Sequence, residues 1–482
     1  MNFIFIDCIF LGLILCYFLF GLFTKPLNRN NEVFSIIALI LCFTQMMIFL
    51  SLINEVHVYY YINYCFVSTA LILYSKIFVL LCLIIFILIS IFYLKDSYMS
   101  IFEFYFFIMI ATWAMFILIS SNDLFVMFLV MELLNLSLYV LISLKRESNL
   151  AIEAGFKYLM LNGFSASILG LGLSFIYCFF GTLNITNLIL LGGVYDEILC
   201  IIGIIFILIG VLFKLAIFPF HYWIADIYEG SDIIVTTFLA IIPKIAAIIL
   251  FIKLYIVFIN FIFNYNFILI IICILSMIYS TIIALYQEKI KRLLAFTAMA
   301  HMTFIILCIC LNSVEGLIAA IFYLFVYILI TINIFSILLS FKFLAKADFG
   351  TLLKVVDCVR ILKTNGFLAF SFACSLMSMA GIPPFAGFFA KLLVFQALAQ
   401  TENFAALIFF ILMSIISAIY YIRLIRFLFF NNTENITYSL VFSLNNKIIN
   451  NVIIITLFIN IFFYFFFPIM YEGCALLILL DV

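Results

Sequence analysis

Three lysines that lie near prolines inside long apolar runs are the residues of this sequence best suited to chemistry. They are Lys214 before Pro219, Lys244 after Pro243, and Lys391 after Pro383 and Pro384. A lysine at mid-membrane costs roughly 3 kcal/mol to insert, so an intramembrane lysine indicates a functional site. Proline removes a helical hydrogen bond, and the freed carbonyl is tolerated at membrane depth only where protein or water satisfies it. The combination predicts a hydrated site inside a helical bundle, with helix breaks at these prolines.

A glutamate and a histidine would complete a proton path with these lysines. Glu132 lies close to the centre of the apolar run DLFVMFLVMELLNLSLYVLISLKR, and His301 lies within RLLAFTAMAHMTF. Desolvation favours neutral lysine and a nearby carboxylate favours charged lysine, so moving Glu132 relative to Lys214 would load or release a proton. Histidine titrates near neutral pH, which suits His301 to relay protons between Lys244 and Lys391. The alternative for His301 is a core histidine satisfied by a hydroxyl.

Other ionisable residues in the apolar runs have simpler explanations. Lys157 follows Glu153 by one helical turn, and Lys253 lies near the end of its helix, so either ammonium could reach the membrane surface. Lys76 lies deeper in its run and has no predicted role beyond a local partner. His221 follows the first proline break, where a role in proton access and a structural role fit the sequence equally.

The composition requires these residues to be positioned by membrane helices. The chain has 482 residues, of which 69% are hydrophobic and 9% are charged, and its mean hydropathy is +1.43. A soluble core does not need so much apolar surface, so the expected fold class is an all-α polytopic membrane protein. Basic and acidic residues balance at 22 each, which gives no sign of a nucleic-acid partner. The thirteen cysteines lie mostly in apolar runs without metal-like spacing and are expected to be small buried hydrophobes.

Apolar runs long enough to cross a bilayer predict fourteen helices. The runs are 3–23, 33–53, 65–94, 99–119, 124–143, 153–180, 198–223, 232–256, 263–286, 293–311, 316–341, 367–399, 404–426 and 450–470. The loop charges support this division, because sixteen of the 22 basic residues fall in odd-numbered loops and none in even-numbered loops. This unequal distribution of basic residues predicts that both termini lie on the face of the membrane opposite to the basic loops.

Missing motifs narrow the function further. The sequence has no Walker A motif, no GxGxxG after a strand and no CxxC set, which argues against nucleotide, flavin and iron–sulfur binding in this chain. The start MNFIFIDCIFLG has no basic region before its apolar run, so a membrane helix is expected there rather than a cleaved signal. Glycines in ILGLGLSFIYCFFG are expected to let membrane helices pack closely. The abundance of Phe, Tyr, Ile and Asn suggests an AT-rich genome such as that of an organelle.

Two proline-containing segments form a faint internal repeat. AIFPFHYW follows Lys214 and GIPPFAGFFAK ends at Lys391, so each joins an apolar-Pro-Phe core to a lysine. The loop charges predict that the two segments enter the membrane from opposite faces. A short polar turn (225–232) is expected directly after the first segment. Inverted repeats that meet at broken helices are typical of ion transporters.

Four motifs together resemble one family. PFHYWIADIYEGSD, EAGFKYLMLNGFSAS, KIKRLLAFTAMAHM and MAGIPPFAGFFAK resemble the antiporter-like family of subunit 2, or subunit N in bacteria, of the proton-translocating NADH:quinone oxidoreductase, respiratory complex I. The similarity runs from about Asn122 to Lys391 with the same motif order and spacing. IYEGSD and the lysine at 391 favour subunit 2, because subunit 4 usually has a His-Val-Glu-Ala-Pro type of turn and a glutamate. Ala298 and Thr303 depart from the family pattern around His301.

The resemblance implies fourteen core helices, two inverted five-helix repeats and broken helices 7 and 12. It divides the chain into an N-terminal three-helix segment (1–98), a first repeat (99–257, helices 4–8), a second repeat (258–430, helices 9–13) and a C-terminal helix and tail (431–482). It also implies a proton path through Glu132, Lys157, Lys214, Lys244, His301 and Lys391.

The function implied by the resemblance is proton translocation coupled to NADH oxidation and quinone reduction in other subunits. The chain would be a subunit of NADH:ubiquinone reductase without a redox centre, and FMN, iron–sulfur clusters and quinone would be bound elsewhere in the complex. Its partners would be other membrane subunits, especially antiporter-like subunit 4 and small subunits 4L, 6 and 3, together with the lipid bilayer and protons. The expected location is the mitochondrial inner membrane, or a bacterial plasma membrane, with basic loops on the matrix or cytoplasmic side. The alternatives are an Mrp-type cation/proton antiporter and a scaffold whose charges only tie helices together.

Overall fold

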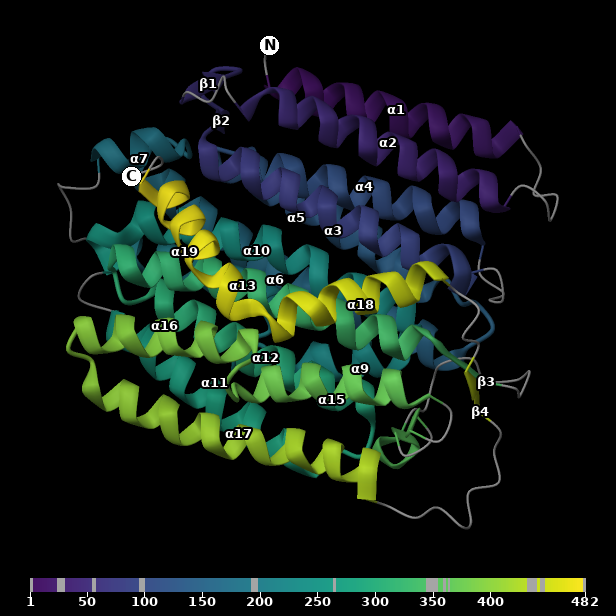
Figure 1. Cartoon of the computed structure of the whole chain (residues 1–482). Helices are drawn as coiled ribbons and strands as arrows, with labels where there is room; N and C mark the ends of the chain where they lie inside the picture. The colour runs from purple at the N-terminus through teal and green to yellow at the C-terminus, as the bar shows by residue number, and fades with distance from the viewer. Residues whose placement is uncertain are drawn as a thin grey trace. The chain divides into compact units, whose positions relative to one another are not determined.

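The computed structural model shows a largely helical chain (Figure 1). The chain divides into two compact units. It describes residues 3–23, 31–53, 58–94, 100–191, 198–262, 266–343, 354–358, 361–362, 365–430, 440–442 and 447–479. The first unit is formed by residues up to Leu215 and by Ile242–Asn264, and the second by Ala216–Ile241 and Tyr265–Leu479. The division falls within helix α10 (Ile233–Ile262), which contributes residues to both units.

The first unit is a helical bundle with one short hairpin. Its elements are α1 (Phe3–Phe23), α2 (Asn31–Ser51), β1 (Tyr59–Tyr61), β2 (Phe66–Ser68), α3 (Ala70–Leu94), α4 (Ile101–Ser120), α5 (Leu124–Ser143), α6 (Asn149–Phe180), α7 (Ile185–Leu191), α8 (Ile198–Lys214) and the later part of α10. Helices α1 to α5 lie side by side (Figure 1), with direct contacts between successive neighbours such as α2 with α3 and α4 with α5. The antiparallel hairpin pairs Tyr59 with Ser68.

Glycines bring α6 and α8 into close contact. A Cβ atom added to Gly172 of α6 would lie 2.8 Å from the carbonyl oxygen of Gly203 in α8, and one added to Gly210 would lie 2.8 Å from a Leu169 side-chain atom. Backbones approach this closely only where side chains are absent, as is common between membrane helices. The expected packing role of the glycine-rich run is confirmed for Gly172.

The second unit combines further long helices with pairs of shorter ones. Its elements are α9 (Tyr222–Gly230), the start of α10, α11 (Asn266–Tyr286), α12 (Ile290–Ile309), α13 (Val314–Leu339), β3 (Phe341–Phe343), the 3-10 helix η3 (Val355–Cys358), α15 (Gly366–Ala380), α16 (Ala386–Gln400), α17 (Phe404–Phe430), β4 (Leu440–Phe442), α18 (Lys447–Ile461) and α19 (Phe463–Leu479). Strands β3 and β4 pair antiparallel. Helices α15, α16 and α17 contact one another, and α12 and α13 are almost wholly buried.

The polytopic all-α membrane class is confirmed, with eleven described helices long and apolar enough to cross a membrane. The number becomes twelve if α18 and α19, which are bent by 83° relative to each other, count as one span. This bend divides the apolar run 450–470, for which the sequence predicts one helix. Helices α8, α15 and α16 are apolar but shorter.

The prolines differ in their effect on the helices. Pro219 lies between α8 and α9, and Pro383 and Pro384 lie between α15 and α16. The break expected at Pro243 is not found, because α10 continues through this residue. Proline removes one backbone hydrogen bond but need not end a helix whose other bonds and packing persist, and the residues of α10 around Pro243 are mostly buried.

Candidate functional site

In the first unit, Lys214 and Glu132 come from different helices and share one polar neighbourhood. Lys214 is the last residue of α8, and Glu132 lies in the middle of α5; both are half-buried. The Glu132 carboxylate interacts electrostatically with the Lys214 ammonium. Asn135, about one turn further along α5, donates a hydrogen bond from Nδ2 to Glu132 Oε1 at 3.0 Å. The structure therefore places together the carboxylate and the lysine that the sequence assigned to one path.

Two residues of α6 make the direct contacts to Lys214. The Lys214 Nζ donates to Asn162 Oδ1 at 2.9 Å and lies 5.8 Å from the centre of the Tyr158 ring. Asn162 is itself fixed, because its Nδ2 donates to the Tyr158 backbone carbonyl at 2.8 Å. An amide oxygen accepts a hydrogen bond from charged or neutral lysine, whereas a carboxylate favours the charged form. Lys214 can therefore keep its position when its charge changes.

Lys244 and Lys157 occupy different environments in the first unit. Lys244 lies in α10 and only 6% of its surface is exposed. Lys157 lies in α6 and pairs with Glu153, with 2.8 Å between Nζ and Oε1 and 41% of its side chain exposed. This pair has the one-turn spacing that stabilises ion pairs along a helix. Lys157 therefore has a local counter-charge at a partly exposed position.

In the second unit, buried His301 of α12 has a hydroxyl at each ring nitrogen. Its Nδ1 lies 2.9 Å from the Tyr323 hydroxyl of α13, and its Nε2 lies 3.0 Å from the Tyr421 hydroxyl of α17. A neutral imidazole donates from one nitrogen and accepts at the other. A relay at this ring would take up a proton at one nitrogen and release a proton from the other. This geometry fits both the relay and the alternative of a core histidine satisfied by hydroxyls.

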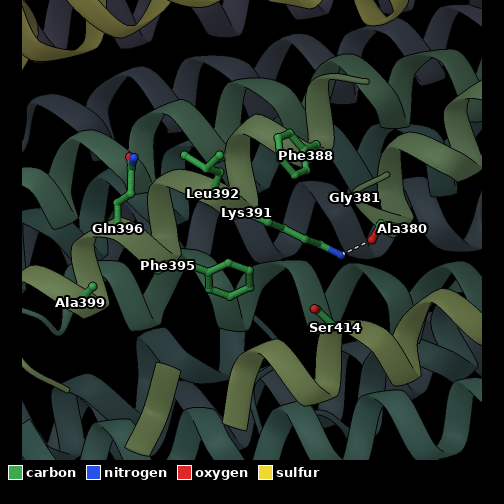
Figure 2. A pocket seen from close by; sticks show the side chains of 9 residues that line it. All are labelled: Ala380, Gly381, Phe388, Lys391, Leu392, Phe395, Gln396, Ala399 and Ser414. Atoms are coloured by element: carbon green, nitrogen blue, oxygen red, sulfur yellow. Dashed lines mark hydrogen bonds between the residues drawn. The ribbon is translucent and has the colours of Figure 1, made fainter. Parts of the chain in front are cut away.

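Lys391 of α16 and His301 line the same small cavity. Its water-accessible volume is about 10 Å³, close to the minimum that holds one water. Tyr323 and Ser378 also line it. Lys391 is 5% exposed and donates from Nζ to the Ala380 carbonyl at 2.7 Å (Figure 2). The cavity could thus connect the lysine to the histidine through a single water.

Acidic residues of α9 pair with basic residues at the start of α12. Arg292 Nη2 lies 2.8 Å from Asp226 Oδ1, and Arg292 Nε lies 3.2 Å from Glu229 Oε2. Lys289 forms a further ion pair with Glu229. The stretch 225–232, expected as a polar turn, is therefore mostly part of helix α9. The carboxylates of Asp226 and Glu229 are paired with basic residues at the start of α12, so the polarity of this stretch does not indicate a loop.

His221, just before α9, packs among aromatic rings. Its ring centre lies 4.0 Å from that of Tyr279, and Phe218 and Tyr222 also contact the ring. The residue is 2% exposed. This setting fits both the structural role and the role in proton access, and each stays a prediction.

The two lysines without an assigned role both have local partners. Lys76 of α3 pairs with Asp7 of α1, with 2.5 Å between Nζ and Oδ2 and side chains that are 2% and 0% exposed. Lys253 of α10 donates to the backbone carbonyls of Ile119 and Ser121 at the end of α4. Carbonyls at a helix end have no partner within the helix, so Lys253 supplies a missing donor.

Sequence reasoning missed the neutral partners of the charged residues. Asn162 and Tyr158 lie one turn apart in the motif EAGFKYLMLNGFSAS, so the motif contained a usable signal for them. Tyr323 and Tyr421 had no such signal, because the chain contains 26 tyrosines in similar apolar contexts.

Comparison with known proteins identifies relatives over most of the chain. The family described as NADH:quinone oxidoreductase/Mrp antiporter, transmembrane, matches residues 121–417. NADH-quinone oxidoreductase subunit N of Pelagibacter ubique is 37% identical over 345 residues, which cover 71% of this chain and 72% of the relative. NADH-ubiquinone oxidoreductase chain 2 of Marchantia polymorpha is 35% identical, covering 71% of this chain and 70% of the relative.

Solved structures share the fold across nearly the whole chain. A chain of respiratory complex I from Thermus thermophilus has a TM-score of 0.77 at 22% identity, covering 94% of this chain and 96% of that one. A chain of the Mrp complex from Dietzia sp. has a TM-score of 0.83 at 18% identity, covering 98% and 96%. The fold alone is therefore common to both types of complex, whereas the two sequence relatives named above are a subunit N and a chain 2. Fold, motifs and sequence identity agree that the chain belongs to the antiporter-like NADH:quinone oxidoreductase/Mrp transmembrane family.

Proposed function

We propose that this chain is the antiporter-like, proton-translocating membrane subunit of an NADH:quinone oxidoreductase, equivalent to bacterial subunit N and mitochondrial chain 2. The observation that carries the proposal is identity of 37% and 35% to two such subunits over about 70% of each protein. The buried lysines support it, because ionisable residues inside membrane segments are costly and usually mark ion or proton pathways.

In the first unit, proton loading would depend on Glu132. The carboxylate acts on Lys214 through its charge, while Asn162 holds the Lys214 Nζ in place. A movement of Glu132 away from the lysine would remove stabilisation of the charged form and favour proton release. The coupled groups would titrate as a set. Lys244, buried in α10, is the proposed next residue of the path, and Lys157 with its local ion pair is a peripheral member.

In the second unit, His301 and Lys391 would exchange protons through their shared cavity. The hydroxyls of Tyr323 and Tyr421 position the imidazole and can pass protons to or from it. Lys391, which lines the same cavity, would carry the proton onward.

The proposed architecture has fourteen spans in two inverted five-helix repeats (99–257 and 258–430). The eleven long helices and the bent pair α18–α19 give twelve spans. Counting α8 with α9 as one broken span, and α15 with α16 as another, brings the number to fourteen. The distribution of basic residues supports termini on the side opposite to the matrix or cytoplasm.

The proposed setting is a membrane complex in which other subunits perform the redox chemistry. FMN, iron–sulfur clusters and quinone would be bound by those subunits, and the nearest partners would be antiporter-like subunit 4 and small subunits 4L, 6 and 3. The similarity to chain 2 of Marchantia polymorpha, together with the Phe- and Tyr-rich composition, supports an organelle-encoded protein of the mitochondrial inner membrane.

The test is proton translocation by the assembled complex after single substitutions. Lys214→Ala and Glu132→Ala should lower both proton translocation and coupled NADH:quinone turnover. Lys447→Ala, which changes an exposed lysine at the start of α18, is the matched control and should have no effect. A correctly assembled Lys244→Ala complex with full proton stoichiometry would count heavily against the path.

An Mrp-type cation/proton antiporter is the second candidate, because the family that matches residues 121–417 is described as including Mrp antiporters. The two proposed functions can be distinguished by purifying the assembly on native gels and identifying the chains that co-migrate with this one. Co-migration with NADH dehydrogenase subunits supports the first proposal. Sodium-dependent transport by an assembly without such subunits would support the antiporter.

A further inference from the structure

The Lys391 ammonium donates a hydrogen bond to a backbone carbonyl. Its Nζ donates to the Ala380 carbonyl at 2.7 Å (Figure 2). The same Nζ lies 5.8 Å from the centre of the Phe304 ring. Ala380 is the last residue of α15, where carbonyls lack partners within the helix and the helix carries a partial negative charge. The end of α15 therefore supplies both the hydrogen-bond acceptor and the favourable charge for this ammonium.

Gly381 makes this arrangement possible. It ends α15 in the left-handed conformation, with φ of 84°, and its N–H donates to the carbonyls of Met377 and Ser378. A Cβ atom at Gly381 would lie 2.7 Å from Lys391 Cδ and 3.1 Å from Nζ. A side chain at this position would therefore strain the backbone and also displace the lysine.

Gly387 of α16 allows this helix to approach α15 closely. It lies one turn before Lys391 on α16, and its N–H donates to the Ser378 hydroxyl at 3.0 Å. An added Cβ would lie 1.8 Å from the Ser378 carbonyl oxygen. Helices α15 and α16 are therefore in close contact at Gly387, one turn before Lys391, and a side chain at Gly387 would force them apart.

The lysine held in this way lies between two cavities. One is the small cavity shared with His301. The other has a water-accessible volume of about 420 Å³, and Gly381, Lys391, Gln396 and Ser414 are among its lining residues (Figure 2). Because Lys391 lines both cavities, a change in the position of its side chain would change the access of the ammonium to each of them.

We propose that the Ala380 carbonyl, Gly381 and Gly387 form a seat for Lys391, and that Gly381 is a positioning residue for proton transfer between the two cavities. The inference rests on the proposed proton-translocating function. Gly381 acts only through Lys391, by leaving its stem and ammonium enough space to reach the end of α15.

The experiment measures the rate of proton translocation by the assembled complex during NADH oxidation. Gly381→Asn is the main variant, because asparagine tolerates the left-handed conformation and adds a side chain where Lys391 lies. A displacement of about 1 Å can cost up to a hundredfold in a transfer rate, so we expect a loss of roughly tenfold or more. Gly366→Ala, at the other end of α15 with open space around it, is the matched control and should not change translocation.

A double variant separates positioning from general packing. If Gly381 acts through Lys391, then Gly381→Asn should cause no further loss in a Lys391→Met background. Additional loss in the double variant, normal translocation by Gly381→Asn, or failure of Gly381→Asn to assemble would each overturn the seat. Normal translocation by Lys391→Met alone would instead refute the proposed path through this lysine, which keeps the two failures distinguishable.

Discussion

Replacing Lys76 with methionine should destabilise the N-terminal helices more than removing both charges of its ion pair. The side chains of Lys76 and Asp7 are 2% and 0% exposed, and Nζ and Oδ2 are 2.5 Å apart. Removing one member of a buried pair leaves an uncompensated charge and costs about 3–5 kcal/mol. Replacing both members with apolar residues is often neutral or stabilising by about 1–4 kcal/mol. Lys76→Met should therefore be strongly destabilising, and Asp7→Leu with Lys76→Met should not.

The other contacts to this turn of α1 explain why the double variant should stay folded. Trp113 of α4 donates from Nε1 to the Asp7 backbone carbonyl at 2.9 Å, and Gln45 of α2 donates from Nε2 to the Ile6 carbonyl at 3.4 Å. Both bonds use the backbone of α1, so neither depends on the Asp7 carboxylate. Helix α1 therefore keeps partners on α2 and α4 when the charged pair is removed.

The assay is the melting temperature in detergent, together with the fraction of the chain that assembles on native gels. Lys447→Met, at an exposed position, is the control and should match the unchanged protein. The reasoning would be refuted if Lys76→Met melted like the control. It would also be refuted if the double variant were as unstable as Lys76→Met, because the charge left behind would then not be the cause.

Three further predictions concern the two candidate sites and the packing between α6 and α8. Asn162→Leu removes a hydrogen bond to Lys214 that is worth about 1.5–3 kcal/mol when the lysine is charged, so proton translocation should fall about tenfold or more. Tyr323→Phe removes the partner of His301 Nδ1 and should lower translocation by the assembled complex if the ring relays protons. Gly172→Leu should reduce assembly, because even a Cβ there meets a carbonyl of α8 at 2.8 Å.

Each of these variants has a control at a position without the contact. Asn149→Leu changes an exposed residue at the start of α6, and Tyr464→Phe changes an exposed tyrosine of α19. Gly163→Leu changes a glycine of α6 with open space around it. Unchanged translocation by Tyr323→Phe would favour a purely structural His301, and equal assembly of the two glycine variants would contradict the role given to the α6–α8 contact. Normal pumping by Asn162→Leu would show that Lys214 needs no amide partner.

The charged members of the candidate site could be found from the sequence because their cost is visible there. Glu132, Lys214 and Lys391 interrupt apolar runs, and a charge at such a depth needs a compensating function or partner. Long apolar runs indicated the membrane class for the same reason, since twenty or so apolar residues suffice to span. These inferences use only local composition, which the linear sequence contains in full.

The partners of those charges could not be found in the same way. Asp7 meets Lys76 across 69 positions, and His301 meets Tyr421 across 120. Such contacts depend on which helices pack together. The lengths and sequences of the loops do not determine which helices become neighbours. The path of a helix through a proline is undecided for a similar reason, because α10 continues at Pro243 while α8 ends before Pro219.

Lys214 and Lys391 differ in how their charge is held, and this difference limits how each can be controlled. The amide oxygen of Asn162 holds the Lys214 ammonium in position, and the Glu132 carboxylate interacts with it through charge. On the proposed path, a shift of Glu132 would change the charge of Lys214 while the lysine stays in place. Lys391 has the end of α15 as its acceptor, and a helix end carries a partial charge that is fixed to the backbone. Its hydrogen bond would therefore change if the lysine left Ala380 or if α15 and α16 moved apart. On the proposed path, control by charge would belong to the first unit, and control by position to the second.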